Sequence, residues 1–120
     1  MRIDLIAPPY SGHLHPVLAM ACTLAADHAV RVLSTPSAMV QIARAGLVGV
    51  PLLDADAEHA LDAISDPRHA VRNHPLRMHR QLRAALDVMA RFAQALRVTY
   101  ADASTRPGLV IADFTVPAAG

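Results

Sequence analysis

His13 and Asp113 are residues whose side chains could together carry out acid–base chemistry. His13 lies in the segment PPYSGHLHP, and Asp113 lies in ADFTVP. An imidazole can take a proton from a hydroxyl near neutral pH, and a carboxylate on its other nitrogen fixes the tautomer and stabilises the imidazolium. The sequence contains no G-x-S-x-G motif, so the hydroxyl would belong to a substrate. From residue type alone, a capping or surface histidine and an ordinary turn aspartate are the commoner alternatives.

The elements that would position this pair are alternating strands and helices. Short apolar runs predict strands at 2–7, 30–34, 48–53 and 108–112. Helical patterns lie between them, at about 15–26, 37–45, 56–65 and 76–100. The strands are too apolar to alternate cleanly, which is typical of a parallel sheet covered on both faces. The sequence therefore predicts an α/β fold with a Rossmann-like, doubly wound parallel sheet.

This topology would bring the two candidate residues together. In a doubly wound sheet of strand order 3-2-1-4, strands one and four are neighbours, and ligands gather at the carboxyl ends of the strands. The loops after these two strands carry His13 and Asp113. Neighbouring strands lie about 4.8 Å apart, so a hydrogen bond between the two side chains is sterically reasonable. Pro51 places the third strand near an edge or a bulge.

The segment before the first helix is predicted to be a loop from Pro8 to Leu14. Gly12 would let its backbone turn tightly beside His13. The helix would begin near His15 and Pro16, because proline is suited to the first helical position. His15 is then expected to cap the helix or to contact the rim of the site, rather than to act as the base.

Two later helices carry further local predictions. In the second, Ser37 is the expected N-cap and Gly46 the residue just past the end. The longest helix, 76–100, has apolar residues at three- and four-residue steps that predict its core-facing stripe: Met78, Leu82, Ala85, Leu86, Met89, Ala93, Leu96 and Tyr100. The basic stretch at 72–83 could attract a diphosphate or an anionic membrane surface. A solvated helix face is the commoner alternative.

Composition limits the remaining possibilities. The 120 residues suit one domain, and 53% hydrophobic with 18% charged residues excludes a disordered chain. A net charge of +1 gives no reason to expect nucleic-acid binding. The single cysteine, Cys22, allows no intrachain disulfide, and no run approaches the roughly 20 apolar residues of a membrane span. The expected location is the cytoplasm, with no integral membrane segment and no metal site.

Four motifs together resemble the GT-B glycosyltransferases that modify natural products, of the UDP-glucuronosyl/glucosyl and bacterial macrolide-antibiotic type. The first is G-H-x-x-P, formed by Gly12, His13 and Pro16. The others are a strand that ends in Thr35-Pro36, the run RAGLVGVPL and the run LVIADF. The resemblance covers essentially the whole chain and is strongest at residues 1–53 and 107–120.

The resemblance implies transfer of a sugar, with inversion, from a UDP- or TDP-sugar to a hydroxyl of a small lipophilic acceptor. It implies that His13 is the catalytic base, that Asp113 holds it, and that no other cofactor takes part. Residues 1–120 would form an incomplete N-terminal acceptor-binding domain, inactive alone, because the C-terminal domain that binds the nucleotide sugar is missing. The residues then expected to contact the acceptor are Tyr10, Ser11, Gly12, Met78, His79 and Phe114.

Two other classes of protein also use an α/β sheet of this kind. A nicotinamide-binding domain is disfavoured, because the first loop has no G-x-G-x-x-G and because Ser34 and Thr35 stand where an acidic ribose ligand is expected. A non-catalytic α/β binding module, or a degenerate half-transferase that assists another protein, stays open. The sequence stops where another helix is expected to begin. A four-stranded sheet without that helix would leave apolar surface exposed.

Overall fold

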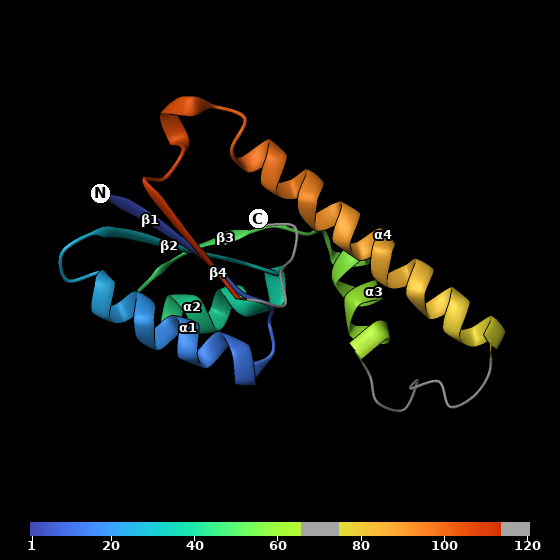
Figure 1. The fold of residues 1–120 in the computed structure, drawn as a ribbon. Coiled ribbons are helices and arrows are strands. Elements are labelled where there is room, and N and C mark those ends of the chain that lie inside the picture. Colours follow the sequence, from blue (N-terminus) through green and yellow to red (C-terminus); the bar gives the residue numbers. More distant parts are fainter. Residues whose placement is uncertain (66–74, 114–120) are drawn as a thin grey trace.

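The computed structural model describes residues 1–65 and 75–113. Its sheet has four parallel strands, β1 (Arg2–Ile6), β2 (Ala29–Ser34), β3 (Val48–Pro51) and β4 (Leu109–Ala112). The strand order is β3-β2-β1-β4, as the sequence predicts (Figure 1). β3 is an edge strand that ends at Pro51, where proline's missing N–H costs no ladder bond.

Helices cover both faces of this sheet (Figure 1). On one face lie α1 (Ser11–Leu24) and α2 (Met39–Arg44), which follows a short 3₁₀ turn at Pro36–Ala38. On the other face lie α3 (Ala55–Ser65) and the C-terminal half of α4 (Pro75–Thr99), and a second 3₁₀ turn, Ala103–Thr105, leads into β4. The predicted doubly wound α/β fold is therefore confirmed.

Alternation along the strands divides the buried side chains into two cores. In β1, Ile3 and Leu5 point to the α1–α2 side, whereas Ile6 points to the α3–α4 side. The second core is completed by α4, whose buried residues are Val88, Phe92 and Leu96. β4 is covered less well: Leu109 is 44% exposed and Val110 38% exposed. Leu109 and Val110 therefore present apolar surface to solvent.

The start of α1 differs from the prediction. The Tyr10 carbonyl accepts hydrogen bonds from the N–H groups of His13 (2.9 Å) and Leu14 (2.8 Å), so the helix begins at Ser11 and not near His15. Pro16 lies inside the helix, where its missing N–H removes one backbone bond near the start. His13 is thus in the first turn of a helix, not in a loop.

The connection into α2 also differs. Ser37 is not an N-cap: it lies within the 3₁₀ turn, and its N–H donates to the Glu58 carboxylate at 3.1 and 3.3 Å. The side-chain acceptor at this turn is therefore the Glu58 carboxylate of α3, not the Ser37 hydroxyl that the sequence predicted. Past the end of α2, Gly46 adopts φ 76°, which confirms its predicted role as a left-handed helix terminator.

Gly46→Ala should lower the free energy of unfolding by about 1 kcal/mol, because a Cβ disfavours this left-handed backbone. The matched control is Gly12→Ala. Gly12 lies in α1, and a Cβ there would meet nothing within 4 Å. That change should leave the stability unchanged or raise it by up to about 1 kcal/mol. Urea unfolding of the two variants checks the difference, and equal losses would contradict it.

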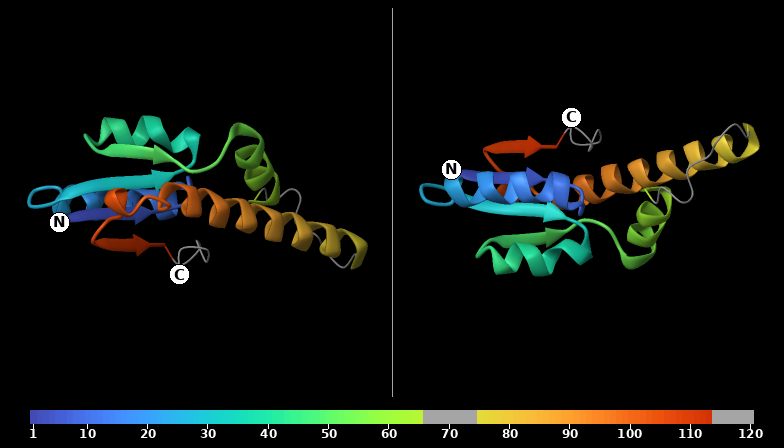
Figure 2. Two further views of the ribbon diagram at one scale, coloured as in Figure 1. Left: turned by 90° about the horizontal axis from the view of Figure 1, so that it is seen from above. Right: turned by 90° about the horizontal axis from the view of Figure 1, so that it is seen from below.

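The prediction that the apolar stripe of α4 faces the core is largely wrong. Only Leu96 and Tyr100 of that stripe reach the core, and the stripe's larger members upstream are exposed: Met78 (57%), Leu82 (58%), Leu86 (54%) and Met89 (39%). The apolar arc of α4 is broader than one stripe, and the sheet and α3 cover only its Val88–Phe92 side. Moreover, the first half of α4 runs past the carboxyl edge of the sheet (Figure 2).

Candidate active site

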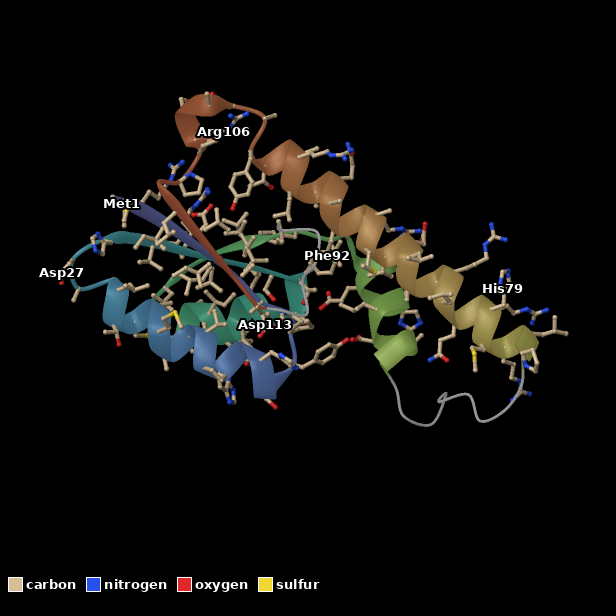
Figure 3. The ribbon with its side chains drawn as sticks, viewed as in Figure 1. Met1, Asp27, His79, Phe92, Arg106 and Asp113 are labelled. Atoms are coloured by element: carbon tan, nitrogen blue, oxygen red, sulfur yellow. The ribbon has the colours of Figure 1, made fainter. Side chains whose placement is uncertain are left out.

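His13 and Asp113 meet at the carboxyl ends of β1 and β4. The Asp113 N–H donates to the Ile6 carbonyl at 2.9 Å, which continues the β1–β4 ladder by one residue and fixes the aspartate beside the end of β1. His13 Nδ1 lies 3.1 Å from Asp113 Oδ2, across 100 residues of sequence. Figure 3 shows Asp113 where β4 ends beside the start of α1. The hydrogen bond that the topology predicted is present.

The exposure of the two side chains differs in a way that suits a base and its partner. The His13 side chain is 32% exposed, whereas that of Asp113 is 12% exposed. An ionised carboxylate only accepts, so a hydrogen bond from a neutral imidazole to an ionised Asp113 requires the ring proton to be on Nδ1. Nε2 then carries the lone pair. An imidazole in this state can accept a proton from a hydroxyl group placed against Nε2.

A short, rigid connection places His13 at this edge. The Ala7 N–H donates to Leu33 at 3.1 Å, and the Ser34 hydroxyl donates to the Ala7 carbonyl at 2.7 Å. Ser34 is fully buried, so this hydrogen bond is shielded from water. Pro8 and Pro9 then fix their own φ angles before α1 begins. This role of Ser34 was not predicted from the sequence, although a hydroxyl side chain at the end of an apolar strand is a usable signal.

A second polar cluster lies on the α4 side of the sheet. Asp4 is fully buried and accepts from Arg31 Nε at 2.8 Å and from the Tyr100 hydroxyl at 2.9 Å. Burial raises the pKa of Tyr100, and its hydrogen bond to Asp4 raises it further. The hydrogen bond to Asp4 is also the main reason that the pKa of Arg31 is raised. The cluster ties the end of α4 to β1 and β2.

The Asp4 cluster was not predicted from the sequence. The available signal was the carboxylate in the middle of the apolar run RIDLIA, since a buried charge needs a partner. Arg31 is its register partner on β2, and Tyr100 was assigned only to the apolar stripe of its helix. The cluster's members are distinct from the His13–Asp113 pair, so we assign it a structural role.

Three of the predicted acceptor contacts lie beside His13. Tyr10 occupies the N-cap position of α1 and is half-buried, and its side chain makes no capping hydrogen bond. Ser11 and Gly12 are exposed in the first helical turn. Gly12 has no left-handed φ, so the tight turn expected there is wrong, because the helix starts earlier than predicted. Contact of these residues with an acceptor stays a prediction.

The other predicted contacts are not brought to the pair. Figure 3 shows His79 near the far end of α4, well away from Asp113, and Met78 precedes it on the same turn. Both side chains are exposed. Phe114 lies outside the described residues. The acceptor-binding role of Met78 and His79 is untested, and in this arrangement neither can reach the His13–Asp113 pair directly.

A groove of about 360 Å³ lies between α4 and the connection from β3 to α3. Its lining includes Leu53, Asp54, Arg91 and Val98, but neither His13 nor Asp113. The groove is therefore separate from the candidate base.

Within 1–65 and 75–113, no three His, Cys, Asp or Glu side chains are grouped as metal ligands. Among the described helices, none combines the length and the apolar character that a membrane span requires.

Known proteins match this chain in its fold. No protein-family model matches the sequence, and no curated protein matches it either. The glycotransferase of kitacinnamycin matches 98% of this chain with a TM-score of 0.72 and 25% identity. CalG4, the calicheamicin glycosyltransferase, matches 94% with a TM-score of 0.68 and 21% identity. Glycosyltransferase VinC, solved in complex with dTDP, matches 98% with a TM-score of 0.58 and 21% identity.

These structures are much longer than the chain. The matches span 26%, 27% and 30% of the three proteins, respectively. The chain thus covers between a quarter and a third of their length, with nearly every residue of its own aligned. The chain therefore has the α/β fold of an N-terminal part of a GT-B glycosyltransferase of the antibiotic and natural-product type.

Proposed function

We propose that this chain supplies the acceptor site and the catalytic base for transfer of a sugar to a hydroxyl group of a small lipophilic acceptor. The His13–Asp113 hydrogen bond carries the proposal. His13 Nε2 removes the acceptor proton while the acceptor oxygen attacks the anomeric carbon of the donor. Asp113 holds the ring in one tautomer and stabilises the imidazolium that forms.

The proposed donor is a nucleoside diphosphate sugar, either a TDP- or a UDP-sugar. Support comes from VinC, which was solved with dTDP, and from the shared fold. Attack on the face of the sugar opposite the leaving nucleotide inverts the anomeric configuration. The donor is bound by a second domain, and the chain alone has no transferase activity. Because a base on the acceptor side activates the acceptor for a single displacement, the reaction needs no covalent sugar–enzyme intermediate.

The test uses a polypeptide that joins this chain to a nucleotide-sugar-binding domain. It is incubated with α-linked TDP-glucose or UDP-glucose and a panel of hydroxylated, lipophilic aglycones, and products are analysed by mass spectrometry and NMR. The expected product is a β-glycoside. A product with retained α configuration would contradict the mechanism. Acceptor binding without turnover for any donor would instead support the non-catalytic binding module.

A further inference from the structure

The groove between α4 and the connection from β3 to α3 has an apolar floor. Its volume of about 360 Å³ lies at the small end of the range of pockets that hold small molecules. Leu52, Leu53 and Ala57 form the floor, and all three are buried. On the wall formed by α4, Val98 adds an apolar side chain that is 67% exposed. A small ligand in this groove would cover apolar surface on two sides.

Two side chains of opposite charge line the same groove. Asp54 ends the connection from β3, and Arg91 is the first residue of α4 in the lining. The connection runs away from β3, whereas α4 runs back toward the sheet (Figures 1 and 2). Asp54 and Arg91 therefore lie toward one end of the groove, and Pro51 and Val98 lie toward the other. The groove thus has a charged end and an apolar end.

The two charged side chains keep open positions for a ligand. Within the described residues they form no ion pair with each other. Asp54 Oδ1 accepts from the Ala57 N–H at 2.7 Å, which leaves Oδ2 open. Arg91 Nε lies 3.1 Å from Asp87 Oδ2, which leaves the two Nη groups open. A carboxylate oxygen can accept from an ammonium group, and the paired Nη groups of a guanidinium match a carboxylate.

We propose that this groove binds a small zwitterion with an apolar body, which is the chemistry of an apolar α-amino acid. The ligand carboxylate binds the Nη groups of Arg91, and its ammonium group binds Oδ2 of Asp54. Its side chain lies between Pro51 and Val98, at the apolar end. Charge complementarity selects this occupant, because a simple anion is repelled by Asp54 and a simple cation by Arg91. The proposal is independent of the proposed sugar transfer, since the candidate base does not line the groove.

The test is an NMR titration of the chain with L-leucine and with two analogues that keep its apolar body. Isocaproate lacks the ammonium group, and isoamylamine lacks the carboxylate. L-Leucine should shift the backbone amide signals of Asp54, Ala95 and Val98. Its Kd should be at least about tenfold lower than that of either analogue, because each analogue lacks one set of charged hydrogen bonds. Equal affinity for L-leucine and either analogue, or no shift at these residues, would overturn the proposal.

Variants separate the two contacts. Arg91→Met keeps the apolar stem and removes the guanidinium, whereas Asp54→Asn keeps the oxygen that accepts from the start of α3 and removes the charge. Each should weaken L-leucine binding by at least about tenfold. The matched controls are Arg97→Met and Asp62→Asn, which change exposed residues of α4 and α3 outside the groove and should bind as the parent does. Circular dichroism should show that all four variants fold. Parent-like binding by either groove variant, or equal losses in the controls, would contradict the assigned contacts.

Discussion

Replacing His13 by alanine should lower kcat of the transferase that contains this chain by about 10²–10⁴-fold, the usual effect of losing a general base. Acceptor binding should change much less, because His13 is partly exposed in the first turn of α1 and belongs to neither core. Steady-state kinetics with a saturating nucleotide sugar measure both quantities. Asp113→Asn should give a smaller loss, because the base is retained while its tautomer is disturbed.

The matched control for this prediction is His15→Ala. His15 is an exposed histidine on the same helix, two residues from His13, so its replacement makes the same chemical change outside the hydrogen-bonded pair. It should keep near-normal turnover. Circular dichroism and thermal unfolding should show that both variants fold. Near-normal kcat for His13→Ala, or equal losses for both, would refute the proposed mechanism.

The sheet could be predicted from the sequence because its signals are local and strong. Apolar runs separated by helical periods predict parallel strands, and general topology rules give the order β3-β2-β1-β4. That order was enough to place His13 near Asp113 across 100 residues. The pair could therefore be predicted from topology before any side-chain geometry was known.

The errors arose where a residue's partner is distant in sequence. Proline near the start of a helix fits either N1 or a later position, and only the Tyr10 carbonyl bonds decide that α1 begins at Ser11. Ser37 resembles an N-cap until Glu58 of another helix binds its N–H. In α4, periodicity locates an apolar arc, but the position of the sheet decides which part of it is buried.

The buried cluster around Asp4 gives the largest expected effect on stability. Arg31→Met should lower the free energy of unfolding by about 3–5 kcal/mol, because it leaves a fully buried carboxylate without its cationic partner. The Tyr100 hydroxyl, 2.9 Å from Asp4, would remain as a side-chain donor but carries no charge. Since small domains have about 5–15 kcal/mol of stability in total, this loss would be a large share. Urea unfolding monitored by circular dichroism measures it.

The control for Arg31→Met is Arg91→Met, which removes an arginine–aspartate pair whose side chains are 46% and 61% exposed. Its loss should stay below about 1 kcal/mol, because water solvates the Asp87 that remains. A comparable loss in the two variants would show that Asp4 does not depend on Arg31. A double variant, Asp4→Asn with Arg31→Met, should be more stable than Arg31→Met alone, because the buried charge is then gone. If the double variant recovered nothing, the loss would come from packing of the arginine stem against the sheet, not from the unpaired carboxylate.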